Sequence, residues 1–286
     1  MTLSRFATPL LCAAVLTLTA CGGNAAPTPE TKASDSFLAS LKADYPVSFA
    51  KIADGVWVHT TNYKLPGQSP IGSNGLVVVD GEDVVLVDGA WGELATVALL
   101  EAIKTEVGKP VTKMIVTHHH PDKVSGVDAA ERVGIQVYTH PDTPVLAARS
   151  GFAVPNTSVA TLKDPRSRAK IGGLEVTFPG EAHAPDNLVV YVPEAAVLYA
   201  GCAVRGAETT TLGNIEDANL TAWPEALRFI KGVYKDAKIV VPGHGKGGDI
   251  SLPDHTLKLL AAKVNTEAGK GSDKPVKTAK EVEDLK

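Results

Sequence analysis

The segment Thr117-His118-His119-His120-Pro121-Asp122-Lys123 decides the fold. It follows directly on an apolar run that predicts a short β-strand ending at Val116. Because alternate side chains of an extended segment point the same way, His118 and His120 can bind one metal ion while His119 faces elsewhere, and Asp122 falls on the same side as the first two. Pro121 and the strand boundary give the loop a fixed shape. The segment is therefore interpreted as a ladder of metal ligands rather than a cluster of surface histidines.

Further ligand types follow at the ends of later predicted strands, each beside glycine or proline, where a fold commonly places functional groups. They are His183, Cys202 and His244. Imidazole, carboxylate and thiolate together suit Zn²⁺, and three protein ligands per ion leave a position open for water, which is typical of catalytic sites. Six ligands of these types predict two zinc ions per chain.

The surrounding pattern predicts strands and helices in two similar halves. Asp80-Gly81 indicates a hairpin turn between two β-branched runs, and Gly108 with Pro110 ends a run of helical periodicity. The predicted strands cover 56–60, 74–80, 83–87, 113–117, 135–139, 174–178, 188–192, 196–201 and 238–241, and the predicted helices cover 94–107, 125–133, 223–234 and 253–262. Strands in the middle of each half with helices outside predict an α/β fold, a four-layer αββα sandwich in one domain over residues 46–268.

The ligand series, in this order, resembles the metallo-β-lactamases, specifically the first subclass of class B, which holds two zinc ions and uses a cysteine ligand. The similarity covers residues 47–262 and extends to short motifs: Ser73-Asn74-Gly75-Leu76, Val85-Leu86-Val87-Asp88 with Trp91, Gly201-Cys202-Ala203-Val204, Leu212-Gly213-Asn214 and Asp217-Ala218-Asn219. The wider superfamily usually carries His-x-His-x-Asp-His, whereas Lys123 stands at the last position here. Cys202 stands where related hydrolases carry a bridging aspartate. Both differences favour a β-lactamase over a thioesterase, a lactonase or a phosphodiesterase.

The resemblance implies two metal-ligand sets. A first zinc ion would be held by His118, His120 and His183, and a second by Asp122, Cys202 and His244. A hydroxide held between the ions would be the nucleophile, because nearby cations lower the pKa of bound water towards neutrality. The second zinc ion would accept the nitrogen anion released when the lactam bond breaks.

Two further polar residues receive roles from the same resemblance. Asn214, twelve residues after Cys202, would donate a hydrogen bond to the developing oxyanion; the alternative is a plain turn asparagine. Lys123 would stabilise the Cys202 thiolate together with Thr117 and Asp88; the alternative is solvent exposure.

At the substrate side the chain departs from the family pattern. Arg205 stands three residues after Cys202, where many members carry lysine, and would bind the substrate carboxylate with a bidentate guanidinium. Residues 63–72, with Leu65, match the hairpin that closes over substrate, and Trp91 would line the same apolar wall unless it is a simple core residue.

The surroundings of the histidines also depart from the pattern. Glu181-Ala182-His183-Ala184 lacks the usual hydroxyl after the histidine, which puts the level of activity in doubt more than metal binding. His59, His140 and His255 are predicted to be structural or exposed rather than ligands.

The N-terminus is predicted to lie outside the folded domain. The apolar run Phe6–Ala20 follows a single charge and is shorter than the about 20 residues that span a bilayer, so residues 1–20 are interpreted as a signal peptide. Leu18-Thr19-Ala20-Cys21 resembles the lipobox of bacterial lipoproteins, which implies a lipid on Cys21; ordinary cleavage after Ala20 is the alternative. Residues 21–45 would form the lipidated end and a linker, and residues 269–286 a charged tail.

Cysteine usage makes Cys202 a residue that needs an explanation. Of the three cysteines, Cys12 would leave with the signal peptide and Cys21 would carry lipid, so the exported protein would keep one thiol and no disulfide. Burial as a small apolar side chain and metal ligation are the two explanations.

Composition narrows the functional classes. With 286 residues, 44% hydrophobic and 21% charged residues and a net charge of −4, the chain is globular and lacks the basic clusters of a nucleic-acid-binding protein. We therefore expect a periplasmic zinc hydrolase, tethered to the outer membrane through Cys21, that opens β-lactam antibiotics and needs no obligate protein partner. The rivals are another hydrolase of this fold and a non-catalytic metal-binding lipoprotein.

Overall fold

The computed structural model describes residues 29–64, 67 and 69–268. The chain divides into two units, residues 1–37 and 38–286, and all the strands lie in the second. The segment expected to be a linker contains helix α1 (Pro29–Asp44), which the sequence pattern did not predict. Ala, Leu, Lys and Glu favour a helix, and proline is well tolerated in its first turn. In the described part of the chain, the structure holds no helix both long and apolar enough for a membrane span.

The first sheet has six strands in the order of the sequence, and its first four are antiparallel. The predicted hairpin turn is confirmed, because Asp80 pairs with Asp83 across Gly81 and Glu82, and Gly81 has a φ of 61°. The last two strands join in parallel, so their carboxyl ends lie at one edge of the sheet. The strands are β1 (Val47–Ala53), β2 (Val56–Tyr63), β3 (Ile71–Asp80), β4 (Asp83–Val87), β5 (Lys113–Ile115) and β6 (Gln136–Tyr138).

The second sheet has five strands in the order β11-β10-β9-β8-β7. Three of its four pairings are antiparallel, and β10 and β11 are parallel, so the residues that follow these two strands also lie at one edge. The strands are β7 (Arg168–Ile171), β8 (Leu174–Thr177), β9 (Val189–Val192), β10 (Val197–Gly201) and β11 (Ile239–Pro242).

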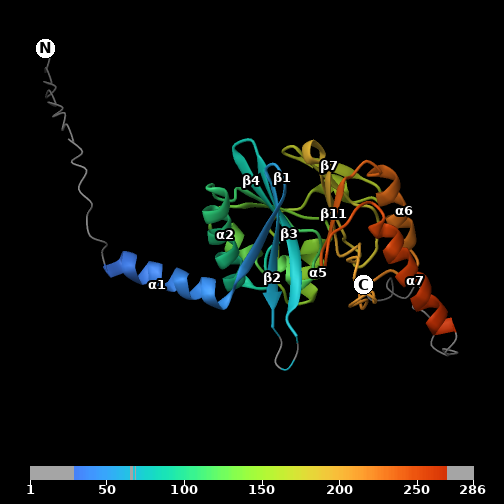
Figure 1. The fold of residues 1–286 in the computed structure, drawn as a ribbon, viewed down its shortest axis with the longest axis horizontal. Coiled ribbons are helices and arrows are strands. Elements are labelled where there is room, and N and C mark those ends of the chain that lie inside the picture. Colours follow the sequence, from blue (N-terminus) through green and yellow to red (C-terminus); the bar gives the residue numbers. More distant parts are fainter. Residues whose placement is uncertain (1–28, 65–66, 68, 269–286) are drawn as a thin grey trace, which may run out of the picture. The chain divides into compact units, whose positions relative to one another are not determined.

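Three apolar cores stack the elements in four layers. The central core joins the facing sides of the two sheets through side chains such as Leu76, Val87, Val190 and Tyr199. A second core packs the outer side of the first sheet against α2 (Glu93–Val107) and α4 (Val127–Arg132). A third packs the outer side of the second sheet against α6 (Trp223–Val233) and α7 (Leu252–Ala268), as Figure 1 shows. The predicted αββα sandwich is confirmed.

Short elements account for most of the differences from the predicted pattern. The ladder of ligands is not extended throughout: His120 is extended, with φ −68° and ψ 153°, but Pro121 begins the short helix α3 (Pro121–Val124). Asp122 therefore lies in the first turn of a helix and not in the extended backbone assumed for the ladder, although it lines the same cavity as His120. The sequence pattern also missed α5 (Thr143–Arg149), β7 and two 3-10 turns at Ala160–Leu162 and Pro193–Ala195.

Candidate metal centre

Three histidines from two loops converge on a first group of ligands. His118 and His120 follow β5, and His183 lies in the loop after β8. One ring nitrogen of each lies within 4.8 Å of the others, and His120 Nδ1 is 3.0 Å from His183 Nε2. His118 Nε2 is buried and has no hydrogen-bond partner within the described part of the chain. A buried nitrogen lone pair without a donor facing it fits a metal ion better than a structural role.

Hydrogen-bond partners outside the ligand set fix which ring nitrogen of His118 and of His120 faces the other ligands. Thr117 Oγ1 donates to Asp88 Oδ2 at 2.8 Å and lies 3.2 Å from His118 Nδ1, so that this nitrogen donates and Nε2 stays free. His120 Nε2 lies 2.9 Å from Asp217 Oδ2, which leaves Nδ1 to face His183. Carboxylates and hydroxyls that orient ligand imidazoles in this way are typical of metal sites.

A second group consists of Asp122, Cys202 and His244, whose ligand atoms also lie within 4.8 Å of one another. Cys202 follows β10 and His244 follows β11, at the parallel end of the second sheet. His244 Nδ1 lies 2.7 Å from the carbonyl oxygen of Gly72, so Nε2 faces Asp122 Oδ2 at 3.2 Å. A Cβ at Gly243 would come within 2.5 Å of the Cys202 sulfur, so glycine is required between the strand and the histidine.

The two groups differ in how they hold protons. Burial lowers the pKa of His118 well below its usual range and lowers that of His183 to about 3, with mutual repulsion of the histidines adding to the effect. Burial also opposes a charge on His244, but Cys202 and Asp122 raise the pKa of His244 to about 10. Burial would raise the pKa of Asp122, but Lys123 and His244 hold it well below its usual value. The protonated His244 ring therefore provides, next to the acidic ligands, the positive charge that a bound metal ion would otherwise provide.

We expect the metal affinity of the second group to depend steeply on pH. Since His244 is protonated at neutral pH and must lose this proton to bind a metal, its affinity should rise about tenfold for each pH unit between about 6 and 9. His118 and His183 are already neutral there, so they add no such slope to the first group. Competition titrations with a chelator at three pH values measure both slopes. Equal slopes for the two groups would contradict the assignment.

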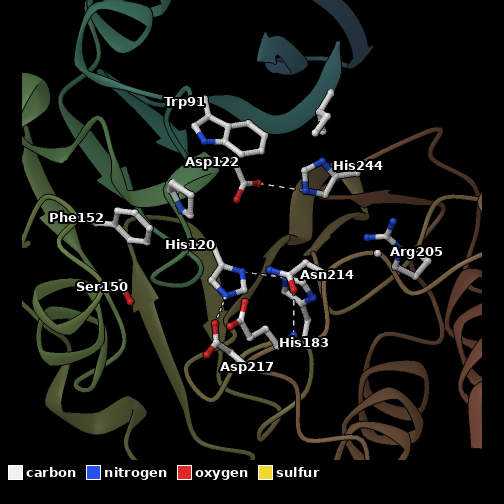
Figure 2. A pocket seen from close by; sticks show the side chains of 14 residues that line it. Trp91, His120, Asp122, Ser150, Phe152, His183, Arg205, Asn214, Asp217 and His244 are labelled. Atoms are coloured by element: carbon white, nitrogen blue, oxygen red, sulfur yellow. Dashed lines mark hydrogen bonds and ion pairs between the residues drawn. The ribbon is translucent and has the colours of Figure 1, made fainter. Parts of the chain in front are cut away.

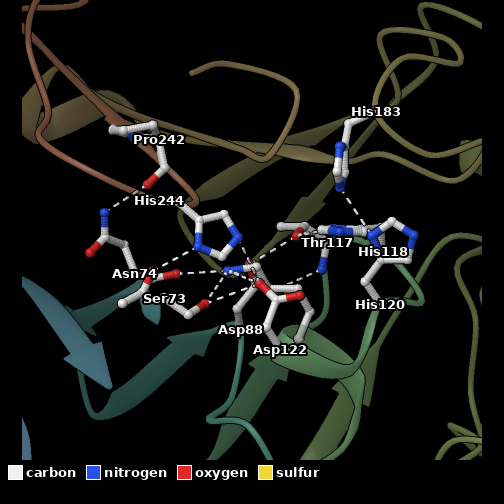
Figure 3. A network of polar contacts seen from close by, with 12 residues as sticks. Ser73, Asn74, Asp88, Thr117, His118, His120, Asp122, His183, Pro242 and His244 are labelled. Carbon is white, nitrogen blue, oxygen red and sulfur yellow. Dashed lines mark hydrogen bonds and ion pairs between the residues drawn. The ribbon is translucent and has the colours of Figure 1, made fainter. Parts of the chain in front are cut away.

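Lys123 lies under the second group and is fully buried, which excludes the exposed alternative. Its Nζ donates to Ser73 Oγ at 2.8 Å and to the carbonyl oxygen of Asn74 at 3.0 Å, and it lies 3.2 Å from Asp122 Oδ2 and 3.7 Å from Asp88 Oδ2. Figure 3 shows these four partners close together. Burial would lower the pKa of Lys123, but Asp122, Cys202 and Asp88 raise it. The side chain is therefore a fixed cation between two buried carboxylates.

The polar network around this lysine joins the two sheets. Asp88 has a positive φ of 61° at the end of β4, and its carboxylate accepts hydrogen bonds from the Thr117 backbone at 2.8 Å and from the Tyr199 hydroxyl at 2.7 Å. Asn74 Nδ2 donates to the carbonyl oxygens of Pro242 and Gly245, on both sides of His244. A strained residue held by several bonds is typical of a site that must keep its geometry.

One cavity of about 600 Å³ is lined by members of both groups, His120 and His183 of the first and Asp122 and His244 of the second (Figure 2). Arg205 lines it with a side chain that is nine-tenths buried and packed on Gly213, and its Nε has no partner in the described part of the chain. Asn214 lines it too; its Oδ1 accepts the backbone N–H of Glu216 at 3.0 Å, which leaves the amide NH₂ for a ligand. The turn and the ligand interpretations of Asn214 are thus compatible.

Aromatic side chains form the opposite wall. Trp91 is half-buried, lines the cavity and stacks on Tyr63 at 4.7 Å between ring centroids. Leu65 and Cys21 lie outside the described residues. None of His59, His140 and His255 joins a metal-capable group within the described ranges; His255 instead lies 2.9 Å from the Thr209 carbonyl oxygen.

Sequence reasoning missed several residues of this site. Asp217 stands out in the sequence only as part of the Asp217-Ala218-Asn219 motif, yet it lies against His120, and Ser150 and Phe152 line the cavity from the segment after α5. Tyr199 was read only as a strand residue. Its position three residues before Cys202 on a buried strand is the one signal that could have placed it near the metal ligands.

Two facing sheets with paired ligand groups at one edge define a class of proteins with a binuclear metal centre on an αββα sandwich. The Metallo-beta-lactamase superfamily profile matches residues 69–244. A metallo-beta-lactamase type 2 of Bacillus sp. (strain 170) is 36% identical over 216 residues, which are 75% of this chain and 82% of the relative, and that of Bacteroides fragilis is 31% identical, over 77% and 88%. The chain belongs to the metallo-beta-lactamase superfamily.

Solved structures agree with this assignment. A metallo-beta-lactamase from Pontibacter korlensis is 41% identical with a TM-score of 0.69, over 75% of this chain and 99% of that one. FIM-1 from Pseudomonas aeruginosa, in a mono-zinc form, is 32% identical with a TM-score of 0.72, over 76% and 96%. The family resemblance drawn from the sequence is confirmed.

Proposed function

We propose that this protein is a zinc-dependent hydrolase that opens the β-lactam ring. The observation that carries the proposal is the pair of adjacent ligand groups, one of three histidines and one of Asp122, Cys202 and His244, because members of both line a single cavity. Sequence relatives from Bacillus and Bacteroides that carry the name metallo-beta-lactamase support the same activity. Each group would hold one zinc ion, because imidazole, carboxylate and thiolate are ligands that zinc accepts. The cysteine favours the first subclass of class B.

The chain's own side chains would bind and orient the substrate. Zinc, when bound, supplies acidification of water and a positive charge for the bond that breaks. The Asn214 amide faces the cavity and would donate to the lactam carbonyl oxygen as negative charge develops there. Arg205 would hold the substrate carboxylate, and the Trp91 ring would exclude water from one side. Lys123 does not line the cavity and would instead keep the Asp122 carboxylate ionised.

The test of this function is hydrolysis of nitrocefin by the full chain. We expect turnover with zinc and its loss after EDTA treatment, with recovery when zinc is restored. Assays of the same zinc-loaded protein with a panel of thioesters and lactones distinguish β-lactam hydrolysis from the activities of other hydrolases of this fold. Full metal loading without turnover of any β-lactam would overturn the proposal, and turnover confined to the panel would favour one of those hydrolases.

Arg205 gives a prediction for substrate binding. Arg205→Ala should raise KM for a carboxylate-bearing β-lactam about tenfold and change kcat less, because hydrogen bonds to charged groups contribute about 1.5–3 kcal/mol before screening and the carboxylate is present in the ground and transition states alike. Added salt should weaken the wild type more than the variant. Steady-state kinetics measure both effects. Equal KM values for the wild type and the variant would show that Arg205 does not bind the carboxylate, and Lys64 or Lys246 would be the next cation to test.

We propose further that the protein is exported and anchored through Cys21. The sequence features that support it are the apolar run before this cysteine and the lipobox-like residues. In bacterial cells, Cys21→Ala should move the protein from the membrane fraction to the soluble periplasmic fraction. Wild type and variant both in the soluble fraction would instead favour ordinary cleavage after Ala20.

A further inference from the structure

His119 lies between two ligands of the first group in the sequence, and its ring packs against that of His120 at 4.7 Å between centroids. It is buried, and its two ring nitrogens face two carboxylates: Nδ1 lies 2.9 Å from Asp186 Oδ1, and Nε2 lies 3.7 Å from Asp217 Oδ2. Asp186 is itself fully buried, and its other oxygen accepts a hydrogen bond from Thr143 Oγ1 at 2.8 Å. One end of the His119 ring is thus fixed by a buried chain of bonds that reaches α5.

The other end of the ring faces a carboxylate that has little else to hold it. Asp217 lies in an exposed loop, and 46% of its side chain is exposed. In the described ranges, its carboxylate forms ion pairs or hydrogen bonds with the side chains of His119 and His120. Since the same Oδ2 atom lies 2.9 Å from His120 Nε2, whatever fixes Asp217 also fixes the orientation of a metal ligand.

The hydrogen bond from Asp217 matters for the first group because the described part of the chain offers few other hydrogen bonds that orient its ligand rings. His118 is oriented by Thr117, but His183 Nδ1 is buried without a partner among the residues that the structure describes, and Ala184 beside it offers no hydroxyl. Among the described residues, hydrogen-bond partners outside the group are therefore present for two of the three ligand rings, and Asp217 is the partner of one of them. Asn214 lies three residues before Asp217 in the same loop, so the loop that faces the substrate shares the same anchor.

We propose that His119 is a positioning residue: it links buried Asp186 to Asp217, holds Asp217 against His120, and thereby sets the zinc affinity of the first ligand group. The inference rests on the proposed zinc binding but not on β-lactam turnover. Outer partners of metal ligands commonly contribute 10–100-fold to metal affinity.

The test compares two amides at position 119. An asparagine amide can replace Nδ1 and keep the bond to Asp186, whereas a glutamine amide reaches towards the position of Nε2 and Asp217. We expect His119→Asn to weaken zinc binding at the first group about tenfold or more, and His119→Gln to recover part of the loss. His140→Asn is the matched control, because His140 is equally buried and nearby but contacts Phe178 and the backbone of Asp142 instead of Asp217.

Zinc dissociation constants are measured on the full chain by competition with a chelator, without any substrate. The cobalt–thiolate absorption of the metal-substituted protein reports the second group separately and shows that the variant is folded. Asp217→Asn should reproduce the loss, and the double variant His119→Asn/Asp217→Asn should be no weaker than Asp217→Asn alone. A first-group affinity within twofold of wild type in His119→Asn, or in Asp217→Asn if the former does not fold, would overturn the proposal. Failure of the nitrocefin assay would leave this result unaffected.

Discussion

Cys202→Ala is expected to bind one zinc ion where the wild type binds two, and to lose more than about a hundredfold in β-lactam turnover. Its sulfur lies in the group with Asp122 and His244, at the end of β10, and removing it leaves that group with two ligands. Loss of a ligand should cost at least as much as loss of an outer partner, which commonly costs 10–100-fold. Metal analysis of the purified variant and nitrocefin kinetics measure the two losses.

A matched pair of variants separates ligation from packing. Cys202 is fully buried, so the rival explanation is a small apolar side chain in the core. On that explanation Cys202→Ala is tolerated and Cys202→Ser, which buries a hydroxyl, is the more damaging change. On the ligand explanation both variants lose the second zinc ion, while the three histidines still hold the first. Unchanged metal stoichiometry in Cys202→Ala would return the thiol to the core.

The sequence predicted the parts of this site that follow strands. His118, Cys202 and His244 each follow a buried apolar run, and strand ends beside glycine are places where local pattern and tertiary position agree. The hairpin at Gly81 and the helix end at Gly108, with φ values of 61° and 77°, were predictable for a similar reason, because positive φ favours glycine.

The remaining parts depend on contacts that no local pattern carries. Helix α3 is four residues long, too short for periodicity to reveal, yet it turns Asp122 towards the second group. Asp217 meets His120 across 97 positions of sequence, and Tyr199 meets Asp88 across 111. The burial of Lys123 could not be inferred from its own segment, because Asp88, which follows β4, and the acceptors Ser73 and Asn74 on β3 are distant from it in the sequence.

The burial of Lys123 gives the largest expected effect on stability. Lys123→Met keeps much of the side-chain length and removes the charge, which leaves Asp88 buried without its cation and Asp122 with that of His244 alone. Removing one partner of a buried ionic network commonly destabilises a protein by about 3–5 kcal/mol. We expect a loss of this size in the free energy of unfolding, measured by urea denaturation of the metal-free protein.

Lys113→Met is the matched control, because Lys113 on β5 also pairs with a carboxylate, that of Asp83 on β4, but in a partly exposed position. Exposed pairs contribute about 0–1 kcal/mol, so the control should lose little. Zinc should reduce the loss in Lys123→Met, since a cation bound by Asp122 compensates that carboxylate, but it should not abolish the loss, because Asp88 lies in neither ligand group. Equal losses in Lys123→Met and Lys113→Met would show that the buried carboxylates do not need this lysine, and the case for Lys123 as the cation beneath the second metal group would fail with it.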